Sequence, residues 1–315
     1  MDRYDKKILF QLDKNSRVTL NQLSKITRKS KQFVTYRIKR LEEEGIIKGY
    51  RAIIDASKLG FTTHRIYVKF QNSDQATINQ FIEYVKPKEE VLGLALMNGK
   101  WDFALFLGTK NTLELHQFWD ELFLTFKHHL RSYNFCLYQP IHFFTRRFFI
   151  EEAREPGEIV YGEGSRAEYD ETDLKIIKEI ENNSRKAATE VATQLGLSTD
   201  TVIRRIKNLQ NKKIICGYNL HLDYEKLGVT EYRVDLYLNS TQRNKELFQF
   251  CKQHAHIFCV NMTIGGADFE IALAARSFYE FTNILGQIKS KFKDVINSDE
   301  YIGFSSFSLV RYIPD

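Results

Sequence analysis

The sequence of 315 residues lacks a long apolar run and has only four cysteines. No stretch approaches the about 18 consecutive apolar residues that a membrane-spanning helix needs. The N-terminal segment MDRYDKKILF carries charges where a secretion signal needs an apolar core. The cysteines (Cys136, Cys216, Cys251 and Cys259) do not recur between the two halves of the chain that are described below, so they do not form a disulfide framework. We therefore expect a cytoplasmic protein.

Sequence signatures of catalysis and of metal binding are also lacking. There is no phosphate-binding loop, no nucleophile elbow and no pair of catalytic carboxylates. Four residues of zinc-ligand type lie in the segment CKQHAHIFC at 251–259. If 256–263 is a strand, however, His256 and Cys259 point to opposite faces, because side chains alternate along a strand. We expect no metal site, no cofactor and no enzymatic activity.

What the sequence does contain is an internal duplication. The segment IIKGY at 46–50 recurs as IICGY at 214–218, an offset of 168 residues. Comparison of 5–60 with 173–228 gives 20 identities in 56 positions without a gap. Further on, at an offset of 166, Gly99 recurs as Gly265. A long fixed period indicates duplicated architecture rather than a solenoid of short repeats.

Each half opens with three helical patterns followed by a strand pattern. The third helix of the first half is expected to run from its N-cap Ser30 to about Glu44, with Val34, Ile38 and Leu41 as its buried stripe. Ser198 begins the equivalent helix of the second half. The next segments, IIKGYRAIID and IICGYNLHLD, read as short strands around a glycine turn, which would form a small wing. Three helices and a wing predict a winged helix-turn-helix.

The rest of each half alternates strands and helices in the order βαββαβ, which predicts a ferredoxin-like domain. We therefore expect an α+β fold with two copies of a winged helix-turn-helix and a ferredoxin-like βαββαβ domain. The expected ranges are 1–60 for the first winged helix-turn-helix, 61–150 for the first βαββαβ domain, 151–167 for a linker, 168–228 for the second winged helix-turn-helix and 229–315 for the second βαββαβ domain. The linker is acidic, contains several glycines and has little periodicity.

These strings resemble the Lrp/AsnC family of feast/famine transcriptional regulators. The resemblance rests on RIKRLEEEGIIKGY and GKWDFAL in the first half, and on STDTVIRRIKNLQNKKIICGY and GGADFEIAL in the second. It implies that each βαββαβ domain is of the RAM type, self-associates through its sheet face and senses small molecules, often amino acids. The ordinary member of the family has one such unit and dimerises, whereas this chain has two in tandem. We therefore expect the two halves to form a pseudo-dimer within the chain.

The distribution of charge favours double-stranded DNA as a partner. Residues 5–60 carry 14 Lys and Arg against 6 Asp and Glu, whereas residues 173–228 carry 10 against 7. Neutralisation of phosphates by such cations supplies much of the affinity for duplex DNA. With its apolar stripe turned inward, the third helix of the first half presents its other face to the major groove. The expected DNA-binding residues of this half are Arg28, Lys29, Ser30, Lys31, Gln32, Thr35, Tyr36, Arg37, Lys39 and Arg40, with the arginines and Lys29 as phosphate contacts.

In the second half the expected DNA-binding residues are Ser198, Thr199, Arg204, Arg205 and Lys207. Asp200 and Ile203, which occupy the positions of Gln32 and Thr35, suit a phosphate poorly. Three roles therefore stay open for this half: recognition of a different half-site, weaker binding, or a brace. For both halves the alternative is a solvated basic face that contacts protein.

The loop between the second and third strands of each βαββαβ domain matches the effector loop of the family. The matching residues are Asn98, Gly99, Asp102, Gly265, Gly266 and Asp268. Glycines would let backbone N–H groups approach an amino-acid-like effector, and the aspartate could hold its ammonium. The alternative is a tight hairpin in which the glycine adopts a positive φ and the aspartate caps the turn.

Two other functions compete with that of a regulator. Siroheme decarboxylases resemble the same family and also combine two related halves. The resemblance implies a Tyr-Asn-Leu-Trp-type string in those enzymes, where this chain has GKWDFAL and GGADFEIAL. A protein-interaction scaffold, in turn, predicts no salt-dependent affinity for DNA. The sequence favours a DNA-binding transcriptional regulator.

Overall fold

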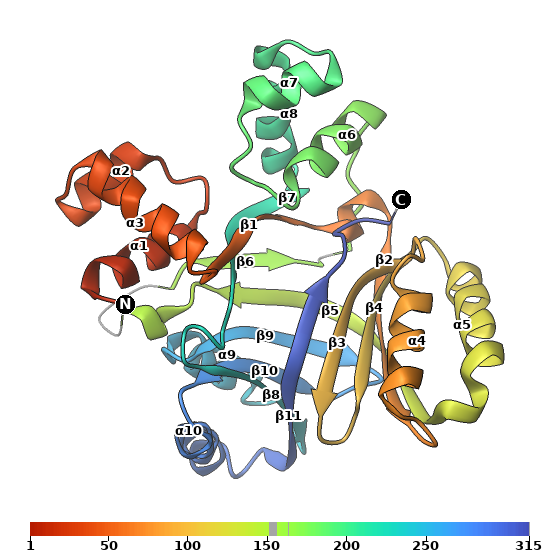
Figure 1. Ribbon diagram of the computed structural model, residues 1–315. Helices are drawn as coiled ribbons and strands as arrows, with labels where there is room; N and C mark the ends of the chain where they lie inside the picture. Colours follow the sequence, from red (N-terminus) through yellow and green to blue (C-terminus); the bar gives the residue numbers. More distant parts are fainter. Residues whose placement is uncertain (151–155, 163, 315) are drawn as a thin grey trace.

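The computed structural model describes residues 1–150, 156–162 and 164–314, and the same order of elements occurs in it twice (Figure 1). The first copy comprises α1 (Arg3–Lys14), α2 (Leu20–Thr27), α3 (Lys31–Glu43), β1 (Ile47–Ile54), β2 (Thr62–Phe70), α4 (Gln75–Val85), β3 (Val91–Asn98), β4 (Phe103–Thr109), α5 (Thr112–Phe126) and β5 (Leu130–Phe144). The second comprises α6 (Glu171–Ile180), α7 (Ala188–Leu195), α8 (Thr199–Asn211), β7 (Ile215–Leu222), β8 (Thr230–Leu238), α9 (Asn244–Gln253), β9 (Ile257–Ile264), β10 (Phe269–Ala275), α10 (Phe278–Lys291) and β11 (Ile296–Leu309). The fold is of mixed α and β content.

Five of the six head helices, α1–α3, α6 and α8, begin at a residue whose side chain caps them, whereas α7 begins after Ala187, which has no capping side chain. The Ser30 hydroxyl accepts a hydrogen bond from the Phe33 amide, and Ser198 does the same for Thr201. Capping satisfies amide groups that the first helical turn leaves unpaired. The predicted stripe of α3 is buried, and so is the equivalent stripe of α8. Local sequence therefore determines where the helices begin and which face they bury.

The predicted wings are different in the structure. Each of the segments 47–54 and 215–222 is one continuous strand, not a hairpin, and the two strands pair antiparallel with each other as a two-stranded ribbon. In this ribbon Arg51 lies directly opposite Asn219, its own counterpart at the offset of 168. The pseudo-twofold axis that relates the halves therefore passes between these two residues. A single strand has no partner within its own head, so pairing across the axis supplies its hydrogen bonds.

The two heads are further joined at this axis. The hydroxyls of Ser16 and Ser184, again 168 residues apart, are hydrogen-bonded at 2.7 Å. The Ser16 amide donates to the Tyr218 carbonyl and the Ser184 amide to the Tyr50 carbonyl. Each head also completes its apolar core with the strand of the other half, because Leu220 and Leu222 pack among the residues of α1–α3 and Ala52 and Ile54 among those of α6–α8. The heads are interlocked rather than independent.

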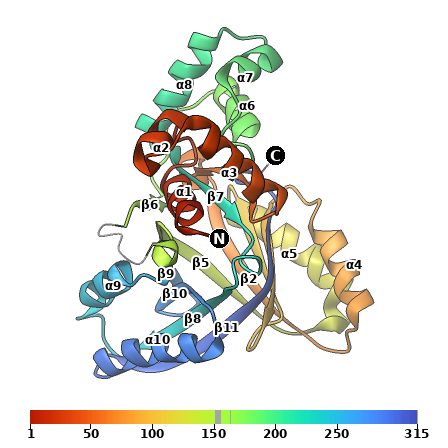
Figure 2. The same ribbon diagram turned by 60° about the vertical axis from the view of Figure 1, so that its left-hand side comes forward.

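Below the heads, the remaining strands form one closed antiparallel barrel (Figures 1 and 2). Within each half the strand order is that of a ferredoxin-like sheet, β5-β2-β4-β3 and β11-β8-β10-β9. The halves then join at their edges, through pairing of β3 with β11 and of β5 with β9. The two sheets of the chain thus join at their edges, and their inner faces also meet inside the barrel, where Arg65 of β2 pairs with Glu270 of β10. Self-association between chains stays a prediction. Edge pairing satisfies the N–H and C=O groups that four edge strands would otherwise expose.

The two faces of the barrel wall have different partners. Helices α4 and α5 cover the outside of the first half, and α9 and α10 that of the second (Figure 2). Along β2, Ile66 and Val68 pack beneath α4 and α5, whereas Arg65 and Tyr67 alternate with them and face the interior. Inside, Arg65 pairs with Glu270, and the Arg233 Nε lies 2.7 Å from Asp235. These two pairs place buried, compensated charge inside the barrel.

The segment expected to be the linker contains a strand. Residues Glu158–Tyr161 form β6, which pairs with the C-terminal end of β5 (residues 141–144). Within the expected linker, 151–167, residues 151–155 and 163 lie outside the described residues. Within the described residues, no helix is long and apolar enough to cross a membrane.

Candidate nucleic-acid interface and axial cavity

The outer face of α3 is polar and exposed. Lys31, Gln32, Thr35, Tyr36 and Lys39 are all exposed, and the Tyr36 side chain is 63 % exposed although it is aromatic. Among the described residues, the only ionic contact that restrains these five side chains is between Lys39 and Glu43, at 3.6 Å. Arg28 and Lys29 are exposed beside the N-terminus of the helix. The face is therefore open to a partner that accepts hydrogen bonds and carries negative charge.

Two of the predicted phosphate contacts have another role. The Arg37 guanidinium lies 2.8 Å from Asp2 and 3.1 Å from Asp5, and that of Arg40 lies 2.6 Å from Asp5. Asp5 is fully buried and completes the capping box of α1. The attraction of Asp5, together with hydrogen bonds, raises the pKa of Arg37 above its usual value despite partial desolvation. Both arginines hold α3 against the N-terminus of α1.

The second head repeats this arrangement. Arg205 lies 2.8 Å from Asp170 and 2.9 Å from Asp173, the counterparts of Asp2 and Asp5, so it also fixes the recognition helix to the first helix of its head. Arg204 and Lys207 are exposed on the outer face of α8. Ile203 on the same face is 53 % exposed. The faces of α3 and α8 carry two exposed cations each, but Arg28 and Lys29 before α3 are replaced by Gly196 and Leu197 before α8, so the second head offers fewer cations.

The loops predicted to bind an effector have internal partners. Asp102 accepts a hydrogen bond from the Phe70 amide at 2.9 Å, and Asp268 accepts one from the equivalent Leu238 amide at 2.8 Å. Gly99 and Gly265 have positive φ, so they suit the turn. Asn98 donates to Ser305, and Gly266 packs closely against Thr263. None of the six lines either of the two cavities described next. An effector role for these loops stays a prediction.

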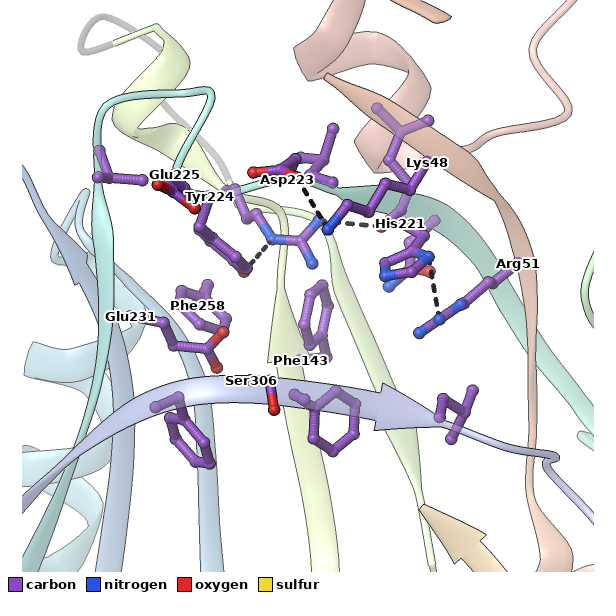
Figure 3. Close-up of a pocket in the computed structure, with 18 of the residues that line it drawn as sticks. Lys48, Arg51, Phe143, His221, Asp223, Tyr224, Glu225, Glu231, Phe258 and Ser306 are labelled. Atoms are coloured by element: carbon purple, nitrogen blue, oxygen red, sulfur yellow. Dashed lines mark hydrogen bonds and ion pairs between the residues drawn. The ribbon is translucent and has the colours of Figure 1, made fainter. Parts of the chain in front are cut away.

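A large hollow lies between the β1–β7 ribbon and the barrel. This axial cavity, of about 710 Å³, has β1 and β7 as its roof and β11 across its floor, with β5, β8 and β9 as walls (Figure 3). A second hollow of about 450 Å³ adjoins it, because Phe143, Tyr161, Glu231 and Tyr312 line both. Its other walls include Arg65 and Arg233 of the barrel interior. The two hollows lie under both heads.

The roof of the axial cavity is basic. Lys48 pairs with Asp223 at 2.8 Å, and Arg146 is buried between Asp13 and the Tyr224 hydroxyl. The guanidinium of Arg51 donates to His221 Nδ1 at 3.0 Å (Figure 3). Burial, reinforced by these cations, lowers the pKa of His221 to about 4. The imidazole is therefore neutral at neutral pH and adds no positive charge to the roof.

Three acidic residues line the cavity, Asp223, Glu225 and Glu231, and Glu231 lies at the start of β8. It lies across the cavity from Arg51, beside Phe258 (Figure 3). Burial raises the pKa of Glu231 to about 7, although Arg146 opposes the shift. It makes no hydrogen bond or ion pair within the described residues. At neutral pH this carboxyl is therefore partly protonated.

The cavity residues were not predicted from the sequence, because they belong to strands with no chemical motif. A signal was nevertheless present, since Arg51 and Asn219 directly follow the repeated Gly-Tyr, at a position where the duplication diverges. The exposed face of α3 was found, because helical periodicity determines which side is buried.

Comparison with known proteins identifies the heads. Residues 1–48 match the model of a winged helix-turn-helix DNA-binding domain, and residues 170–210 match that of an AsnC-type helix-turn-helix domain. The HTH-type transcriptional regulator FL11 of Pyrococcus furiosus is 31% identical over 122 residues, which cover 38% of this chain and 78% of the relative. The proline dehydrogenase transcriptional activator of Rhodobacter capsulatus is 30% identical over 141 residues, or 44% of this chain and 91% of the relative.

The chain belongs to the Lrp/AsnC family of transcriptional regulators. Each relative matches less than half of this chain, as expected when one copy of the unit aligns with a chain that has two. Over its whole length the chain is similar in fold to the siroheme decarboxylase NirDL, with a TM-score of 0.64 and coverage of 99% of this chain and 93% of that one. Because the sequences are only 10% identical, this likeness shows the fold alone.

Proposed function

We propose that this chain is a sequence-specific DNA-binding regulator of transcription that contains both heads of a family dimer. The observation that carries the proposal is the exposed polar and basic face of α3, on a head that matches a winged helix-turn-helix DNA-binding domain. An exposed helix of this kind fits the major groove, where its N-terminal residues reach base edges. Gln32 suits adenine and Lys31 suits guanine or a phosphate.

In this proposal the arginines divide into two groups. Arg28, Lys29 and Arg204 are exposed and contact phosphates, with Ser30, Ser198 and Thr199 at the helix starts. Arg37, Arg40 and Arg205 position the recognition helices through their buried aspartates instead. The second head contributes Arg204 and Lys207, so it binds DNA less strongly than the first.

The proposal extends to the effector, the self-association and the cellular location of the protein. As predicted from the sequence, we propose a cytoplasmic, non-enzymatic protein whose DNA binding responds to an amino-acid-like effector, and which self-associates through its βαββαβ sheets. The family membership and the fold support these points but do not test them.

The test is binding of the purified chain to its own upstream region, with unrelated DNA as the comparison, at two salt concentrations. The double variant Lys31→Ala/Lys39→Ala should weaken binding about tenfold or more and reduce the slope of log affinity against log salt by about 2, because two phosphate or base contacts are lost. The matched control is Lys245→Ala/Lys293→Ala, which removes the same charge from exposed positions of the second βαββαβ domain. The control should bind like the parent.

Two outcomes would contradict the proposal. Equal losses of DNA affinity in both double variants would mean that the lysines of α3 act only through the net charge of the protein. Absence of binding even at low salt would favour the scaffold or the tetrapyrrole enzyme, and incubation with siroheme would then separate these two, since the enzyme retains a chromophore and the scaffold does not.

A further inference from the structure

The axial cavity contains a cation, Arg51, that no carboxylate of the described residues neutralises. Arg51 is half-buried on β1, and within the described residues its guanidinium hydrogen-bonds to the neutral His221 alone. Burial lowers the pKa of Arg51, and nearby Arg146 lowers it further. Removing a charge from water without a partner costs several kcal/mol, so such a position favours an incoming anion.

A second, independent observation comes from the other strand of the roof. Asn219 is 6 % exposed and lines the same cavity, and its Oδ1 has no hydrogen-bond partner in the part of the chain that the structure describes. Buried polar atoms are rarely left unpaired in folded proteins. Because Arg51 and Asn219 are paired directly across the ribbon, their side chains leave it on the same face. A carboxylate that reaches Arg51 thus lies within reach of the Nδ2 group of Asn219, which donates to it, while the unpaired Oδ1 can accept from a hydroxyl or N–H group of the same ligand.

The walls opposite this polar pair are aromatic. Phe143 and Phe258 face the cavity from the barrel (Figure 3), and Phe304 and Phe307 line it from β11. A volume of about 710 Å³ lies within the range of about 300–1,000 Å³ that is common for small-molecule sites. The far side holds Glu231, whose carboxyl has no hydrogen-bond partner among the described residues and suits a neutral polar end of a ligand.

We propose that the axial cavity binds a small organic carboxylate with an extended aromatic body, held by Arg51 and Asn219, and that this ligand regulates the heads. The claim that the ligand regulates DNA binding rests on the proposed function, whereas the claim that the cavity binds the ligand does not. Regulation is expected because the strands of the roof are directly connected to the recognition helices: β1 follows α3 and β7 follows α8 after short turns. A ligand that contacts both strands at the axis therefore contacts the element that sets the spacing of the two recognition helices.

The test uses pyrenebutyrate as the probe and pyrenebutanol, which has the same aromatic body without the charge, as its comparison. Fluorescence anisotropy and calorimetry should show saturable binding of pyrenebutyrate at about one molecule per chain, and at least about tenfold weaker binding of pyrenebutanol. The variant Arg51→Met should reduce that preference to within about twofold. The exposed Arg131 lies outside the cavity, so Arg131→Met is the matched control and should preserve the preference.

A second variant keeps Arg51 in place. Asn219→Asp supplies a carboxylate opposite the guanidinium, so it should stabilise the fold and also weaken pyrenebutyrate about tenfold or more. Equal affinity for both probes in the parent chain would overturn the anion site, and so would unchanged pyrenebutyrate binding in Asn219→Asp. This arm applies even if Arg51→Met fails to fold.

Regulation is measured separately, as the affinity for the upstream DNA with and without saturating pyrenebutyrate. A change of about threefold or more in the parent, lost in Asn219→Asp, is expected. Unchanged DNA affinity in the presence of bound pyrenebutyrate would overturn the claim that the ligand regulates DNA binding. Bound probe with no DNA binding at all would instead overturn the proposed function and leave the site intact.

Discussion

At the scale of single residues, the duplication has kept what holds each head together and has changed what faces the cavity. Arg37 and Arg205 make the same ion pairs with the first helix of their heads. Arg51 and Asn219, by contrast, began as one position and now differ. Identical residues on a symmetry axis would place two guanidiniums side by side, and like charges so close repel. Divergence at this position therefore makes an asymmetric site possible.

Glu231 gives a prediction about stability and pH. Burial raises its pKa in the folded chain to about 7, above the ordinary value of 4.5. The folded state thus binds the proton more tightly, so stability is fully present below pH 4.5 and falls as the pH rises through 7. The side chain in Glu231→Gln is neutral at every pH. Between pH 5 and 8 this variant should therefore lose about 2 kcal/mol less unfolding free energy than the parent, a figure reduced for solvent access to the site.

Urea denaturation across this pH range measures the difference between the parent and Glu231→Gln. The groups that face this carboxyl, Arg146, Tyr224 and Cys259, are present in both proteins, so their own titration cancels. Parallel stability profiles would show that Glu231 has an ordinary pKa.

At the scale of the elements, the sequence predicts what local contacts decide. Ser30 and Ser198 begin helices, and the stripe at 34, 38 and 41 is buried, because caps and helical periodicity involve residues within a few positions. The strands themselves were also predicted. Their partners were not: β1 pairs with β7 and β3 with β11, across about half of the chain or more. Alternation tells which face of a strand is buried but not which edge it meets.

The same limit explains the candidate sites. The exposed face of α3 follows from one helix alone, whereas the axial cavity exists only where β1, β7 and β11 come together. Arg37 and Arg205 looked like free cations on helices. Their aspartates are more than thirty residues away in sequence, so only the fold shows that they are paired.

Two neighbouring arginines of α8 provide a matched pair of variants. Arg205 pairs with Asp173, whose side chain is 6% exposed, while Arg204 is exposed. Arg205→Met should cost about 1–3 kcal/mol of stability, because a buried carboxylate loses its partner. Arg204→Met should stay within about 0.5 kcal/mol of the parent but weaken DNA binding. Thermal unfolding and DNA titration of both variants check this, and equal loss of stability would contradict the division of roles.

At the scale of the whole molecule, the chain is one closed assembly and not two linked units. The barrel closes only when β3 meets β11 and β5 meets β9. The head cores depend on the same union, since Leu220 and Leu222 of β7 complete the core of α1–α3. Deleting one head would therefore remove part of the other, and this is why point variants are the better test of each recognition helix.

Separation of the halves makes this dependence measurable. Residues 1–150 expressed alone would expose two barrel edges and lack the strand that fills the first head, so we expect them to form oligomers or to unfold rather than to stay a folded monomer. Residues 156–315 should behave likewise. Mixed or co-expressed, the two fragments should form a one-to-one complex with a single cooperative unfolding transition. Light scattering gives the mass and calorimetry the transition. If each fragment is instead a folded monomer and the two do not associate, each half keeps its core without its counterpart. The interlocked ribbon and the closed barrel would then contribute little to stability.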